Sequence, residues 1–192
     1  MRIDDGKGLG PQAGVNDDNM LLVSAVEQSI EHYINHVKRE AYNVYFAVNP
    51  DGAGDCFFYL LNDSNKQMDI CFEGLRIQTS AAEEIDIYIN QTGAAVKTNG
   101  ADLTPENLNG GSGNIADVTC YGETGDGAVD ITGISGGRLL ERLWLTDAKS
   151  VLFNFEQDII VPPNQTFSMY AVGGDTLLRG TLFFNFHDTY NG

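Results

Sequence analysis

The chain has 192 residues, a length that fits one domain, and 42% of them are hydrophobic, enough for a packed core and too many for a disordered chain. Its formal net charge is −16, from 11 Lys and Arg residues against 27 Asp and Glu residues. A strongly acidic surface repels phosphate backbones. The sequence therefore predicts no nucleic-acid partner, and it favours a partner whose surface is basic or mixed.

The first segment, residues 1–19, consists mainly of Gly, Asp and Asn and cannot bury a core of its own. We expect it to form a flexible, extended arm, followed by one folded domain over residues 20–192. The apolar residues scattered along the arm are the candidate docking contacts: Ile3, Leu9, Pro11 and Val15. The N-terminus lacks the apolar segment of a signal peptide, and no apolar run predicts a membrane span. We therefore expect folding in a cytoplasm and no membrane partner.

Residues 27–40 allow two interpretations. Four apolar residues fall at the spacing of a helical stripe: Ile30, Tyr33, Ile34 and Val37. An extended loop is equally consistent, because strands are expected on both sides. On a helix, His32 and His36 would share a face and could bind a metal, but no third ligand has a recognisable spacing. The sequence thus predicts no metal site here.

From residue 42 onward, apolar and polar side chains alternate along short segments separated by Gly, Pro, Asn and Asp, a pattern typical of strands and turns. About nine to eleven strands are expected, without the alternating helices of a parallel sheet. The sequence predicts an all-β fold, an antiparallel β-sandwich resembling a jelly roll. The strict parity of two strands predicts one shared core: Ile85, Ile87, Ile89, Leu182, Phe184 and Phe186.

Several segments carry more specific expectations. The apolar run 57–61 predicts a strand covered on both faces, and the change of parity at Glu73–Gly74 predicts a bulge. Residues 97–114 form the longest expected loop. The segment 138–145 can be read as a helix or a buried strand, and we favour the strand. Its Trp144, the single tryptophan, is expected in the core.

The sequence shows no motif that carries chemistry. Cys56, Cys71 and Cys120 lie in apolar surroundings without CxxC spacing, so we expect buried free thiols. The loops 51–55 and 122–127 offer oxygen ligands for calcium, but Asp and Gly also dominate ordinary turns. We predict no catalytic residue, no cofactor and no metal, hence no enzyme. A glycoside-hydrolase pair of carboxylates stays open, because acidic residues are abundant.

Five segments resemble virion structural proteins of tailed bacteriophages. The similarity covers most of the chain and lies in these ranges: Ala13–Ala25, Glu40–Asn43, Ala53–Asn62, Asn154–Pro163 and Gly180–Phe186. The resemblance implies a jelly-roll accessory protein of the particle, made in a bacterial cytoplasm and located in the virion.

Among positions on the particle, we favour a capsid cement or decoration protein that binds the outer surface of the head. Its expected partner is the major capsid protein or another virion protein, and a homotrimer would match the threefold points of a capsid lattice. The arm would then dock on the capsid. The alternatives are a tail or head-fibre component that binds a host glycan, with exposed aromatics such as Tyr121 beside acids, and a polysaccharide-degrading enzyme.

Overall fold

The computed structural model describes residues 14–15, 21–22, 34–63, 68–146 and 149–188. The first two of these ranges form a small antiparallel pair, β1 (Gly14–Val15) with β2 (Leu21–Leu22). Val15 of the expected docking arm therefore lies in a strand, whereas Ile3, Leu9 and Pro11 lie outside the described residues. One turn of π-helix, η1 (Ile34–Lys38), precedes the main body.

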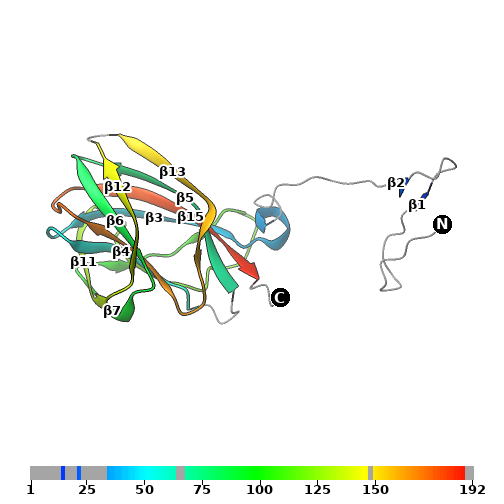
Figure 1. Ribbon diagram of the computed structural model, residues 1–192, viewed down its shortest axis with the longest axis horizontal. Helices are drawn as coiled ribbons and strands as arrows, with labels where there is room; N and C mark the ends of the chain where they lie inside the picture. The colour runs from blue at the N-terminus through cyan, green and yellow to red at the C-terminus, as the bar shows by residue number, and fades with distance from the viewer. Residues whose placement is uncertain (1–13, 16–20, 23–33, 64–67, 147–148, 189–192) are drawn as a thin grey trace.

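Two β-sheets make up the main body (Figure 1). The six-stranded sheet has the order β12-β6-β14-β4-β10-β8. The bounds of its strands, in chain order, are β4 (Asp55–Leu61), β6 (Glu83–Ile89), β8 (Ala101–Asp102), β10 (Thr119–Gly122), β12 (Arg138–Leu145) and β14 (Thr166–Ala171).

The seven-stranded sheet has the order β13-β5-β15-β3-β11-β7, and β9 pairs with β3 beside this path. The bounds of its strands are β3 (Ala41–Pro50), β5 (Met68–Thr79), β7 (Thr92–Thr98), β9 (Glu106–Asn107), β11 (Gly127–Ser135), β13 (Ser150–Val161) and β15 (Leu178–Asp188). Two short strands, β8 of the six-stranded sheet and β9 beside the seven-stranded sheet, interrupt the segment 97–114, which was expected to be the longest loop.

Eight of the strands have the arrangement of a jelly roll. The order β13-β5-β15-β3 in one sheet faces β12-β6-β14-β4 in the other, and every pairing within these two sets is antiparallel. The chain crosses between sheets at most of its connections, as two Greek keys require. The predicted all-β, jelly-roll-like sandwich is confirmed. One short pairing departs from the antiparallel rule, because β11 runs parallel to β3.

The core lies between the sheets and contains the residues predicted from parity. Ile85, Ile87, Leu182, Phe184 and Phe186 are buried, and Ile89 is partly buried against the same cluster. Aromatic rings connect the two layers. The ring of Phe167 in β14 lies 4.5 Å from that of Phe72 in β5, measured between centroids. Burial of such rings is the main favourable term that holds the sheets together.

Strands β7 and β11 form an antiparallel ribbon at one end of the seven-stranded sheet. It continues the hairpin of β6 and β12 beyond Gln91, and β11 packs on β4, where its Val129 and Ile131 are buried. This cover explains why the run 57–61 is almost entirely buried, as predicted for a strand enclosed on both faces. At the connection between β6 and β7, the backbone N–H of Gln91 donates a hydrogen bond to Oγ1 of Thr166 (2.7 Å), which holds this connection against β14.

The predicted bulge at Glu73–Gly74 is confirmed. Phe183 of β15 pairs with Gly74, and Phe184 pairs with Phe72, so Glu73 is the extra residue. Strand β13 bulges opposite, and it joins two runs that look separate in the sequence, 150–155 and 158–161. At that point Nε2 of Gln157 donates to Oε1 of Glu73 (2.9 Å).

The position of Trp144 differs from the prediction, and most of the possible helix over 27–40 lies outside the described residues. The segment 138–145 is a strand, as favoured, but the prediction that Trp144 packs in the core is wrong, because its side chain is 71% exposed. Leu143 and Leu145 point into the core, and alternation places Trp144 on the outer face of the sheet. Of the possible helix over 27–40, only η1 is described; His32 and the side chain of His36 lie outside the described residues.

Candidate protein-interaction surface

The strands β12 and β13 form one side of the sandwich (Figure 1). Each lies at the end of its sheet, and a short connection joins them. Among the described residues, neither strand has a neighbour on its outer side. An edge strand presents free N–H and C=O groups, so it is the part of a sheet on which another chain can most readily pair or pack.

Large apolar side chains are concentrated on these two strands. Among the described residues nine such side chains are exposed, and five of them belong to β12 or β13. We call these five the β12–β13 surface: Leu139, Leu140, Trp144, Leu152 and Ile160. Single exposed hydrophobics are ordinary, but a concentration along one side of a domain indicates an interaction site.

The strand pairing explains how these side chains are arranged. Leu139 pairs with Tyr88 and Trp144 with Glu84, on the outer face of the six-stranded sheet. Leu152 pairs with Arg76 on the outer face of the seven-stranded sheet. Leu140 lies at a bulge in β12. The β12–β13 surface therefore runs along the side of the sandwich where the two edge strands lie. Its side chains project from the outer faces of both sheets next to that side.

A hollow of about 250 Å³ opens beside Trp144, at the end of β6 and β12. Its lining combines apolar and acidic side chains with backbone: Ala82, Glu83, Glu84, Trp144, Leu145, Val172 and Gly173. Oε1 of Glu83 accepts hydrogen bonds from the N–H groups of Gly173 (2.7 Å) and Glu84 (2.9 Å). This carboxylate is thus held in one orientation at the wall of the hollow.

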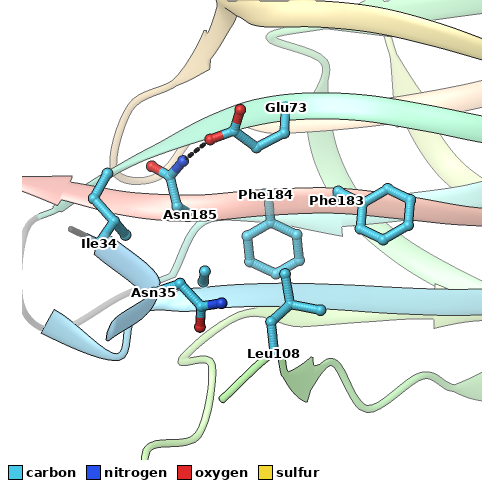
Figure 2. A pocket seen from close by; sticks show the side chains of 8 residues that line it. Ile34, Asn35, Glu73, Leu108, Phe183, Phe184 and Asn185 are labelled. Atoms are coloured by element: carbon cyan, nitrogen blue, oxygen red, sulfur yellow. Dashed lines mark hydrogen bonds between the residues drawn. The ribbon is translucent and has the colours of Figure 1, made fainter. Parts of the chain in front are cut away.

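A second hollow, of about 260 Å³, lies beside η1 (Figure 2). Figure 2 shows Ile34 and Asn35 on one side and Phe183, Phe184 and Asn185 on the strand that crosses it. Nδ2 of Asn185 donates to Glu73. The segment 34–39 is held in place by the long connection after β9, since Nδ2 of Asn109 donates to the carbonyl of Asn35 (3.2 Å).

Tyr121, which the glycan-binding alternative predicts to be exposed, has a different environment. It lies in β10 and is partly buried, with its ring stacked on that of Tyr59 at 5.7 Å between centroids. Nζ of Lys97 lies 4.9 Å from the Tyr121 ring centroid and forms an ion pair with Asp102 (2.5 Å). Trp144, which was expected in the core, is an exposed aromatic that shares the lining of a hollow with the carboxylates of Glu83 and Glu84.

The three cysteines are buried and free, as predicted. Burial raises the pKa of Cys56 to about 12 and that of Cys71 to about 11, and it also raises the pKa of Cys120. Their thiolate forms are therefore scarce at neutral pH, which makes them poor nucleophiles and poor metal ligands.

The acidic loop 51–55 lies close to another carboxylate, that of Asp130. Burial, together with the charges of Asp55 and Asp51, raises the pKa of Asp130. In the described part of the chain, no three His, Cys, Asp or Glu side chains gather in a way that could hold a metal ion.

Within the described ranges, no helix has the length and hydropathy needed to cross a membrane. Comparison with protein-family models, with curated proteins and with solved structures finds no match for this chain.

Proposed function

We propose that this chain is a structural protein of a tailed-phage particle, and specifically a cement or decoration protein. It binds the outer surface of the head as a homotrimer and stabilises the shell. The observation that carries the proposal is the β12–β13 surface, where five large apolar side chains lie exposed along two edge strands. The resemblance of the strand sequences to phage virion proteins supplies the biological setting.

The β12–β13 surface has the features of a protein interface. It contains Trp144, and exposed tryptophan is among the residues that contribute most to binding when a partner covers them. The acidic residues near it include Glu84 and Asp86, so the rim is polar. The charge of −16 favours a partner with a basic surface. On a capsid, that partner would be the major capsid protein.

A homotrimer would match the threefold symmetry of points on a capsid lattice. Closed cyclic symmetry lets one surface patch serve every subunit, and a threefold assembly fits the local threefold points of a shell. The arm over residues 1–19, with Ile3, Leu9, Pro11 and Val15, would add contacts on the capsid or on a neighbouring subunit. Its ordering would cost about 1–2 kcal/mol per residue in backbone entropy, so contacts along much of its length are needed.

Binding to shells tests the proposal. Capsid shells assembled from the major capsid protein encoded with this chain are mixed with the purified protein and sedimented, and light scattering gives the mass of the free protein. We expect saturable co-sedimentation and the mass of a trimer. Leu152→Asp places a charge on the β12–β13 surface and should abolish co-sedimentation.

The matched control is Ile115→Asp, which introduces the same charge at a residue that is 76% exposed and lies on neither edge strand. It should bind shells as the unmodified protein does. Equal binding by both variants would contradict the assignment of the interface. A glycan array and a polysaccharide-hydrolysis assay with the pure protein test the fibre and enzyme alternatives, and a positive result in either would replace the proposal.

A further inference from the structure

We propose that the hollow beside Trp144 is a socket for a cationic side chain, Arg or Lys, that the partner protein inserts. This inference rests on the proposed function, because it assigns the chemistry of the partner at the β12–β13 surface. Its elements are an exposed indole, two carboxylates and a volume of about 250 Å³.

The indole and the carboxylates lie together because of the strand register. Trp144 of β12 pairs directly with Glu84 of β6, and paired residues project from the same face of a sheet. Glu83, the next residue, lies at the end of β6 and lines the same hollow. The hollow is therefore lined by the indole of Trp144 and by the side chains of both glutamates.

Glu83 is oriented by backbone groups rather than by a cation. Both of its protein donors, the N–H groups of Gly173 and Glu84, bind Oε1. Among the described residues no donor binds Oε2, so this oxygen is available to an incoming N–H group. A hydrogen bond from a cationic donor to a carboxylate is charge-assisted and about twice as strong as one between neutral groups, so an Arg or Lys donor is favoured at this oxygen.

The nearest arginine leaves Glu84 only partly neutralised. Arg142 binds Asp86 through two short contacts, Nε to Oδ1 (2.5 Å) and Nη2 to Oδ2 (2.7 Å). The contact between Arg142 and Glu84 is longer, with 3.6 Å between Nη1 and Oε2. Glu83, Glu84 and Asp86 against Arg142 amount to three formal negative charges and one positive charge, so the group keeps two negative charges and attracts a cation.

Tryptophan is the aromatic side chain that binds cations best, since the negative face of its ring attracts a guanidinium or ammonium group. Tryptophan and arginine also occur together at the energetic centres of protein interfaces. The overall charge of −16 attracts basic segments of a partner to the protein, and this also favours binding of a cation at the hollow. Arg and Lys share this chemistry, although the planar guanidinium can also stack on the indole and bind a carboxylate through two bonds.

The single tryptophan makes the inference directly measurable, because all tryptophan fluorescence of the full chain reports on Trp144. Three short peptides serve as probes; they are identical and uncharged except at one central residue, which is Arg, Lys or citrulline. Citrulline has nearly the shape of Arg but no charge. We expect saturable changes in emission with the Arg and Lys peptides, and an affinity at least tenfold lower for the citrulline peptide.

Two variants of equal charge change locate the site. Glu84→Gln should lower the affinity for the Arg peptide at least fivefold, whereas Glu106→Gln, in β9 and away from the hollow, should leave it unchanged. Far-UV circular dichroism and the urea midpoint establish that both variants remain folded. Equal affinity for the Arg and citrulline peptides, or no effect of Glu84→Gln, would overturn the proposal. So would saturable emission changes with neutral oligosaccharides but not with the Arg peptide, which would indicate a sugar site.

Failure of the socket and failure of the proposed function can be told apart. If Leu152→Asp abolishes shell binding while no cationic peptide binds at Trp144, the interface is correct and the socket is wrong. If the Arg peptide binds with the expected dependence on Glu84 while the full chain ignores capsid shells, the socket stands and the assigned partner is wrong.

Discussion

Replacing Phe167 by alanine tests how the two sheets are held together. Phe167 lies in the middle of the six-stranded sheet with no exposed surface, and its ring contacts Phe72 of the opposite sheet at 4.5 Å and Phe58 at 6.3 Å between centroids. Alanine removes the ring and leaves a cavity between the layers. For a fully buried phenylalanine, this change lowers the free energy of unfolding by about 3–5 kcal/mol.

That loss is large against the total stability of a domain, about 5–15 kcal/mol. Urea denaturation followed by far-UV circular dichroism measures it, and the midpoint should fall while the slope stays constant. Ile115→Ala is the control, since its side chain is 76% exposed and its removal should change stability by less than about 0.5 kcal/mol. A loss below about 1 kcal/mol for Phe167→Ala would refute the packing of the sheets around this ring.

The remaining predictions concern polar groups and thiols. Oε1 of Gln91 accepts hydrogen bonds from the hydroxyls of Ser168 and Tyr170. Ser168→Ala removes one of the two and should lower the free energy of unfolding by about 0.5–1.5 kcal/mol in urea titrations. The raised pKa of Asp130 means that the folded state favours its protonated form, so this group's contribution to stability is lost as pH rises through the interval between the unfolded and folded pKa values. Asp130→Asn should remove that dependence from urea midpoints measured between about pH 3 and pH 7. All three thiols should resist a disulfide reagent in the native protein and react after unfolding, because they are buried; rapid labelling of the native chain would contradict the core.

Much of the fold could be predicted from residue patterns. Strict alternation in 85–89 and 182–186 identified two interior strands, β6 and β15, and the faces that they bury, because a period of two has one structural meaning when one face is apolar. The parity change at Glu73–Gly74 likewise identified a bulge. The pairing order could not be predicted, since it depends on contacts between strands far apart in the chain.

The β12–β13 surface could not be predicted from the sequence. In the segment 138–145, apolar residues stand at both odd and even positions, so both faces of the strand carry them. A strand that is buried on both faces has the same pattern. The two cases differ in whether the outer face of β12 is covered. Trp144 projects from that face and is exposed, whereas its neighbours Leu143 and Leu145 project from the other face and are buried. The acids next to it, Glu83 and Glu84, were indistinguishable from the many other carboxylates until the register paired Glu84 with Trp144.

The most direct test of the central claim is the structure of capsid shells saturated with this protein, determined by electron cryomicroscopy. The account predicts density on the outer surface of the shell at threefold and local threefold points, with the β12–β13 surface covered by protein and Trp144 at the contact. Shells that carry no added density, although the protein is folded and in excess, would contradict it. So would bound protein whose β12 and β13 strands face the solvent.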